Sequence, residues 1–153
     1  MTTVVERPAI RPKEFHFPLS IRWLGGRRIE AVVDDKQPVE VAPPPVFHGS
    51  DPTTWSPEDF LVAASASCFA ITFTGLAARE GVACSALSVE ADGVAGLRDD
   101  GRFGFRRILL RVTIEGDEVE ELRLLAERAE ENCLVSASLD LPVEIDIDVR
   151  QAE

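Results

Sequence analysis

The chain of 153 residues is long enough for one domain with a substantial core, and its 45% hydrophobic and 28% charged residues are typical of a soluble globular protein. A formal net charge of −11 argues against nucleic acid or an anionic membrane as the main partner. The three cysteines and two histidines include no CxxC pair and fit neither a disulfide scaffold nor a zinc site, so we expect no metal.

Residues 1–12 are expected to form a flexible tail or an arm that reaches a partner subunit. They are too polar and too interrupted by proline to be a signal peptide, which favours a cytoplasmic protein. Residues 13–153 are expected to form a single domain.

The domain is predicted to begin with short strands. Apolar residues alternate from Phe15 to Trp23, which predicts a strand. Gly25-Gly26 predicts a hairpin turn, with a return strand over residues 29–33 and a shorter strand around residues 39–41.

A long helix is predicted after a Pro-rich loop at residues 42–56, and loops of this length are often functional. Ser56 is the expected N-cap, and Gly81 is the expected stop. From Phe60 to Ala78 the helix carries no charge and is long enough on paper to span a bilayer. Because serines, threonines and alanines lower its hydrophobicity, we expect it to be buried in protein on all sides.

Two strands, a helix and a last strand are predicted for the rest of the chain. The strands at residues 85–97 and 102–116 are joined by the turn "RDDG". A stripe of apolar residues predicts a helix over residues 117–133, and alternation predicts a strand over residues 141–151. This order indicates an α+β fold and not a Rossmann alternation.

Two cysteines on different helices are the candidate reactive groups. Cys68 lies within the first helix and Cys133 ends the apolar stripe of the second, so both thiols are predicted to point into one interior. Such a pair suits a reaction in which one sulfur attacks and the other resolves. Burial raises the pKa of a thiol, so a thiolate would need a cation nearby. Arg27 and Arg28 at the hairpin turn are the candidates, and Glu58 could hold one of them bidentately.

The segment "PEDFLVAASASC", followed by the later "CLVS", resembles the OsmC/Ohr family of thiol-dependent peroxidases. The upstream "GGR" turn and the ten-residue step from Glu58 to Cys68 match the family too, so the resemblance spans roughly residues 15 to 150. The family usually has proline after the second cysteine, where this chain has Leu134.

The resemblance implies an OsmC-like α+β fold in which antiparallel sheets wrap two central helices of an intertwined homodimer. It implies a Cys-based peroxidase that reduces organic hydroperoxides or hydrogen peroxide through a Cys68 thiolate and a Cys68–Cys133 disulfide. Arg27 would stabilise the thiolate, and Glu58 would orient the arginine. The resemblance requires no cofactor beyond an external dithiol reductant such as a lipoyl group.

Other interpretations of these residues stay open. His48 and Trp55 lie in the loop before the long helix and are candidate substrate-binding residues. An exposed loop position for His48 and a hydrophobic staple for Trp55 are the simpler interpretations. Cys84 is interpreted as structural. The alternatives to a peroxidase are a non-enzymatic dimer that binds a small ligand and a thiol redox sensor without peroxide specificity.

Overall fold

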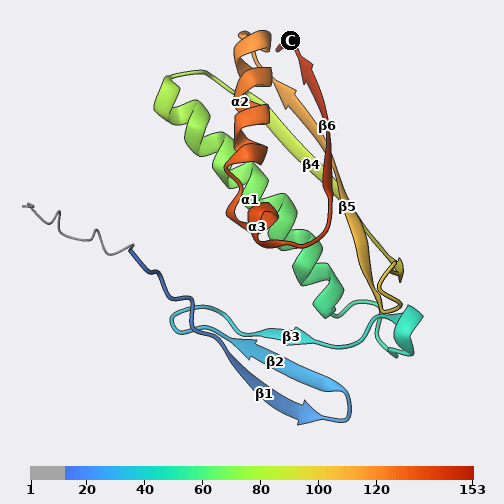
Figure 1. The fold of residues 1–153 in the computed structure, drawn as a ribbon. Coiled ribbons are helices and arrows are strands. Elements are labelled where there is room, and N and C mark those ends of the chain that lie inside the picture. Colours follow the sequence, from blue (N-terminus) through green and yellow to red (C-terminus); the bar gives the residue numbers. More distant parts are fainter. Residues whose placement is uncertain (1–12) are drawn as a thin grey trace, which may run out of the picture. The chain divides into compact units, whose positions relative to one another are not determined.

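The computed structural model describes residues 13–153 (Figure 1). The chain divides into two compact units, one ending at Thr54 and the other beginning at Trp55, within the stretch predicted to be a single domain. Each unit has its own three-stranded sheet. The predicted tail at residues 1–12 lies outside the described residues.

The first unit holds an antiparallel sheet of β1 (Ser20–Gly25), β2 (Arg28–Val32) and β3 (Val39–Val41), in that order. The predicted hairpin is confirmed, with Gly25 and Gly26 at φ 109° and 56°, values that the turn requires and glycine adopts freely. The first strand is shorter than predicted, since residues 15–19 alternate in hydrophobicity but are not in a strand. Pro18 lacks the N–H that a sheet ladder requires, which accounts for the later start.

The Pro-rich segment after β3 folds into a tight turn around the short 3-10 helix η1 (Pro45–Phe47). The Gly49 N–H donates a hydrogen bond to the Pro44 carbonyl at 3.0 Å. A Cβ atom on Gly49 would lie 1.7 Å from the carbonyl oxygen of Pro43, so only glycine fits there. The segment predicted as an irregular connection is therefore a specifically shaped turn.

The second unit begins with the long helix α1 (Pro57–Glu80). The Ser56 hydroxyl accepts a hydrogen bond from the Asp59 N–H, and the Asp59 carboxylate accepts one from the Ser56 N–H, which completes a capping box. Gly81, at φ 73°, ends the helix in the left-handed conformation. The predicted start and stop of this helix are both confirmed.

The sheet of the second unit is mixed and not purely antiparallel. The long strands β4 (Ala86–Leu97) and β5 (Phe103–Glu115) form the predicted antiparallel hairpin, but β6 (Val143–Arg150) pairs with β5 in parallel. Parallel neighbours need a crossover connection, which α2 (Val119–Glu131) and the short α3 (Leu134–Ser138) provide. The helix predicted over residues 117–133 is confirmed as α2, and the short α3 that follows it was not predicted.

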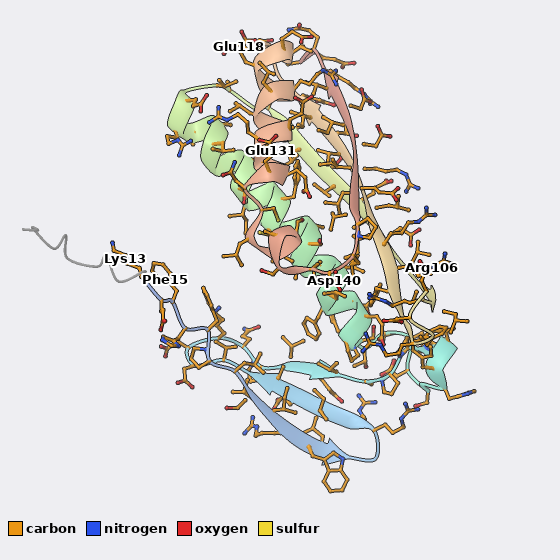
Figure 2. The ribbon with its side chains drawn as sticks, in the orientation of Figure 1. Lys13, Phe15, Arg106, Glu118, Glu131 and Asp140 are labelled. Atoms are coloured by element: carbon orange, nitrogen blue, oxygen red, sulfur yellow. The ribbon has the colours of Figure 1, made fainter. Side chains whose placement is uncertain are left out.

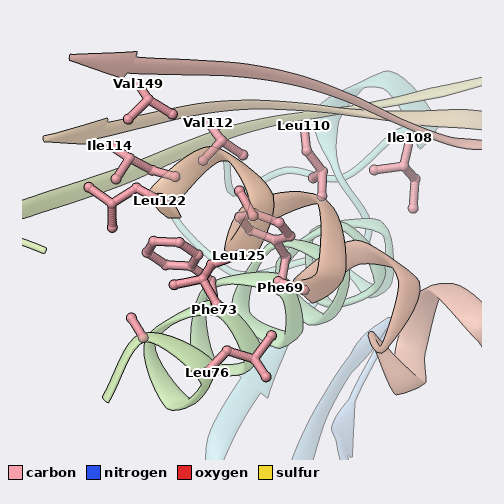
Figure 3. Packing of buried hydrophobic residues seen from close by; sticks show 13 residues of the cluster. Phe69, Phe73, Leu76, Ile108, Leu110, Val112, Ile114, Leu122, Leu125 and Val149 are labelled. Atoms are coloured by element: carbon pink, nitrogen blue, oxygen red, sulfur yellow. The ribbon is translucent and has the colours of Figure 1, made fainter. Parts of the chain in front are cut away.

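One hydrophobic core fixes α1 and α2 to the same sheet (Figure 3). Alternate residues of β5 point into this core, and their neighbours on the strand are less buried, as period-two geometry requires. The most deeply buried members come from both helices and the middle strand: Phe69, Phe73, Leu122, Leu125, Ile108, Leu110 and Ile114. Full burial of one such side chain contributes about 1.5–3 kcal/mol, so the core holds α1 firmly in place.

Gly93 allows α1 to approach β4 closely. A Cβ atom at this position would lie 2.5 Å from Cγ2 of Val62 on α1 and 2.6 Å from Cε1 of Phe105 on β5. These distances are shorter than carbon atoms tolerate, so a side chain here would push the helix or the Phe105 ring away. The glycine therefore sets how closely the helix packs on the sheet.

Only one side of α1 is buried within the chain, whereas burial on all sides was predicted. Ile71 is 72% exposed on the outward side. Small residues there are exposed as well: Ser67, Thr74, Gly75 and Ala78. By length and composition alone α1 could cross a membrane, a test that core helices of soluble proteins also pass. Because Phe69 and Phe73 pack within the core, the inward side of α1 is that of a protein-buried helix.

Candidate active site

The structure brings Cys68 and Cys133 together, as the sequence predicted. Cys68 lies in the middle of α1 and is half-buried, while Cys133 is fully buried at the start of α3. The Cys133 side chain lies close enough to the Cys68 sulfur to lower the pKa of that thiol. Both cysteines are in the free form, so the site is a dithiol.

The pKa of Cys68 is lowered from its ordinary value, which favours the thiolate. Burial is the largest single influence and acts to raise this pKa, but several hydrogen bonds together outweigh it. They come from the backbone N–H of Val135, the Cys133 thiol, the backbone N–H of Leu134 and the Thr72 hydroxyl. Neutral donors on α1 and α3 therefore lower this pKa, an effect that was predicted for a cation.

The pKa of Cys133 shifts in the opposite direction. Burial raises it most, and the negative charge of Cys68 raises it further, while the backbone N–H and hydroxyl of Ser136 lower it in part. Cys68 therefore gives up its proton more readily than Cys133 does. Because the thiolate is the reactive form of a cysteine, this difference favours Cys68 over Cys133 as the more reactive sulfur.

The donors to Cys68 were not found from the sequence. Thr72 follows Cys68 by four residues on the same helix face, a spacing that could have indicated the contact. Leu134 and Val135 act through their backbone and give no side-chain signal. Their N–H groups are available because the first turn of a helix has no internal hydrogen-bond partners for them.

The two candidate arginines lie in the first unit and have different partners there. Arg28 forms ion pairs with Glu40 and, at 3.6 Å, with Asp51, and its pKa is raised mainly by the hydrogen bond to Glu40. The exposed Arg27 donates a hydrogen bond from Nη1 to the Phe47 carbonyl at 3.0 Å. Within residues 13–54, Arg27 is therefore the arginine that is not paired with a carboxylate.

Glu58 lies in the first turn of α1, and its Oε2 atom is buried without a hydrogen-bond partner among the described residues. Ten residues of α-helix span about 15 Å along the axis, so Glu58 does not contact Cys68. Any influence of Glu58 on the thiol needs a third group between them. The catalytic roles of Arg27 and Glu58 stay predictions.

The two candidate substrate-binding residues lie where structural roles explain them. His48 is exposed at the end of η1, with a left-handed φ of 62°. Trp55 stacks on Phe60 with ring centroids 5.5 Å apart, and these residues flank the helix cap at the positions of a hydrophobic staple. The structure gives both residues a structural explanation, and their roles in binding a substrate stay predictions.

The model of the OsmC-like protein family matches residues 48–148, which is most of the chain and includes both cysteines. This chain belongs to the OsmC family.

Relatives of this OsmC-family chain support the fold over nearly its whole length. The uncharacterised protein YmaD of Bacillus subtilis is 24% identical over 142 residues, covering 88% of this chain and 93% of the relative. An OsmC-like protein of unknown function from Vibrio cholerae has a TM-score of 0.81 at 18% identity, covering 88% of this chain and 99% of its own. An organic hydroperoxide resistance protein from Elizabethkingia anophelis has a TM-score of 0.75 at 22% identity, covering 93% and 100%. The predicted OsmC-like fold is confirmed.

Two hollows in the second unit of this OsmC-family chain lie away from the thiols. One, of about 510 Å³, lies beside the β4–β5 turn and is lined by residues that include Arg106 and Asp140, both labelled in Figure 2. The other, of about 490 Å³, lies between the end of α1 and the outer face of α2. Neither is lined by Cys68 or Cys133. Within residues 13–153, no group of three or more His, Cys, Asp or Glu side chains is arranged to hold a metal ion.

Proposed function

We propose that this protein is a cytoplasmic thiol peroxidase that reduces organic hydroperoxides or hydrogen peroxide through Cys68. The observation that carries the proposal is the pair of thiols whose pKa values shift in opposite directions across a hydrogen bond. A thiolate with a protonated thiol beside it has what a peroxide-reducing dithiol needs. The similar fold of an organic hydroperoxide resistance protein supports the same chemistry.

The proposed reaction has three steps. The Cys68 thiolate attacks the distal oxygen of the peroxide, the O–O bond breaks, and the alkoxide takes up a proton and leaves as alcohol, or as water from hydrogen peroxide. Cys68 is then a sulfenic acid. The Cys133 sulfur attacks Cys68, its proton departs, and the sulfenic hydroxyl leaves as water, which forms a Cys68–Cys133 disulfide. An external dithiol such as a lipoyl group reduces this disulfide by thiol–disulfide exchange and is itself oxidised.

The proposal includes a homodimer and a charged pair that completes the site. The exposed outward side of α1, with Ile71 at its centre, is the surface that a second copy would cover. Arg27 would place its guanidinium near the reacting sulfur, and the unpartnered carboxylate of Glu58 would hold it.

Thiol counting with one equivalent of cumene hydroperoxide tests the proposal. The reduced protein has three free cysteines, and we expect the wild type to lose two thiols and to consume the peroxide. Cys68→Ser is expected to lose no thiols to disulfide formation and to consume no peroxide, while the matched control Cys84→Ser behaves as wild type.

Full peroxidase activity in Cys68→Ser would rule the proposal out. Disulfide formation with diamide but slow reaction with peroxides would indicate a redox sensor instead. A thiol count unchanged by either reagent would indicate a passive pocket.

A further inference from the structure

Two buried oxygen atoms on the helices that flank Cys133 have no hydrogen-bond partner among the described residues. They are Oε2 of Glu130, in the last turn of α2, and Oγ of Ser136, in α3. The Cys133 N–H donates to the Glu130 carbonyl at 3.1 Å, so the break between the two helices places this glutamate within one turn of the thiol. Buried polar atoms normally find partners, and an exception calls for an explanation.

Ser136 lies near both the glutamate and the thiol. Its hydroxyl lies close enough to lower the pKa of Cys133 and, separately, to lower the pKa of Glu130 in part. Burial is the larger influence on Glu130 and raises its pKa overall, and no charged side chain contributes to this shift. A carboxylate with a raised pKa accepts a proton more readily than an exposed one. The ionisable groups of the cluster are Cys68, Cys133 and Glu130.

The resolving step needs a proton acceptor at this place. Cys133 attacks as a thiolate, yet it is fully buried and its proton is held tightly while the pair is reduced. A group that takes the proton as the S–S bond forms would lower the barrier of this step.

We propose that Glu130, acting through the Ser136 hydroxyl, accepts the Cys133 proton as the disulfide forms. This inference rests on the proposed function. The Cys133 proton passes to the Ser136 hydroxyl, and the hydroxyl proton passes to Glu130. The Cys133 sulfur bonds to the Cys68 sulfur, and the sulfenic hydroxyl leaves as hydroxide. This hydroxide takes up the proton held on Glu130 and becomes water, so the step needs no oxidant beyond the peroxide.

Single-turnover kinetics without a reductant separate the two steps. Peroxide loss reports the oxidation of Cys68, and loss of the second thiol reports disulfide formation. Glu130→Gln and Ser136→Ala are expected to leave the first step unchanged and to slow the second by about tenfold or more. Glu131→Gln is the matched control, because this neighbouring glutamate, labelled in Figure 2, is exposed. Glu130→Asp is expected to restore part of the rate.

The pH profile identifies the role of the carboxylate. In the wild type, the second step is expected to slow as the pH falls through the raised pKa of Glu130, because the protonated acid cannot accept a proton. In Glu130→Gln this dependence should be absent. A wild-type rate and profile in Glu130→Gln would overturn the inference, and so would equal slowing of both steps, which would mean a merely structural role.

Diamide allows the role of Glu130 in disulfide formation to be tested without peroxide. Diamide forms an adduct on Cys68, and attack by Cys133 then closes the disulfide, so the same proton must be removed. If the wild type fails to react with peroxide, the proposed function fails, but the slow closure in Glu130→Gln remains measurable with diamide. Equal closure rates in wild type and variant would then overturn the inference alone. Ser136→Ala provides the same test should Glu130→Gln not fold.

Discussion

The side chain of Cys133, which is completely buried, lies beside the sulfur of Cys68 and lowers the pKa of that thiol. The pKa of Cys133 itself is raised, so the two adjacent thiols differ in acidity before any oxidant arrives. This difference supports Cys68 as the proposed nucleophile, a role that the sequence alone could assign only by resemblance.

Replacing Cys133 with alanine removes one donor to the Cys68 thiolate. The pKa of Cys68 is expected to rise, because the hydrogen bond that lowers it is lost. At neutral pH the rate of reaction with peroxide should fall about fivefold, the worth of about one hydrogen bond, and should recover at a pH well above the pKa. Ultraviolet absorbance of the thiolate against pH measures the shift, with Cys84→Ala as control. Mass spectrometry should also show sulfinic acid at Cys68, and an unchanged titration would contradict the assignment.

Leu134→Pro removes a single backbone donor and little else. Leu134 is the first residue of α3, where proline is tolerated, and the preceding Cys133 has the extended backbone that proline favours. The Leu134 side chain is 67% exposed, so its loss disturbs little packing. The pKa of Cys68 should rise and its reaction at neutral pH should slow, whereas Leu134→Ala, which keeps the N–H, should match the wild type. Equal effects of the two substitutions would show that the amide does not act on the thiolate.

Replacing Arg27 and replacing Arg28 should have different effects on the peroxidase rate. Arg27→Ala is expected to lower the peroxidase rate by about 10²-fold, the effect of losing one well-placed electrostatic group. Arg28→Ala removes exposed ion pairs with Glu40 and Asp51 and should leave the rate nearly unchanged. Steady-state rates with cumene hydroperoxide measure both variants. A larger loss in Arg28→Ala would reverse the assignment.

Ile71→Arg tests the proposed dimer surface on α1. In sedimentation velocity the wild type is expected to be a dimer and the variant a monomer, because a buried unpaired charge at the interface is costly. Leu124→Arg is the matched control, since Leu124 is a 58% exposed apolar residue on α2. A wild type that sediments as a monomer, or a variant that stays dimeric, would remove α1 as the interface.

Gly93→Ala should destabilise the second unit by about 1–3 kcal/mol, the cost of overpacking a core. The added methyl group would meet Val62 at 2.5 Å and Phe105 at 2.6 Å. Gly96→Ala is the control, because its Cβ would lie 3.3 Å from a flexible arginine side chain. Urea unfolding followed by circular dichroism measures both variants, and equal midpoints would contradict the close packing of α1 on β4.

Local chemistry explains which parts of the fold were predictable. The cap at Ser56, the stop at Gly81 and the turn at Gly25-Gly26 were predicted because each depends on a few neighbouring residues. The direction of β6 was not, because alternation looks the same in parallel and antiparallel strands. The short helix α3 was missed because it has only five residues, too few to show a helical period.

The candidate site, too, could be predicted only in part from the sequence. Two cysteines on two helices could be placed in one interior from the sequence, and the structure confirms this. The amide donors of Leu134 and Val135 could not be predicted, because every residue except proline carries the same group. The position of Ser136 depends on α3, which the sequence did not predict, so its place beside Cys133 was not predicted either.

Two of the donors to Cys68 belong to the main chain, and this affects how such a site can evolve. Side chains at positions 134 and 135 can drift while the thiol keeps its acidity, because the short helix α3 preserves the donors. A motif search that compares only side chains would overlook these contributions. Because one of these donors is the amide of residue 134, a change of that residue to proline would remove the donor in a single step, whatever the side chain it replaces.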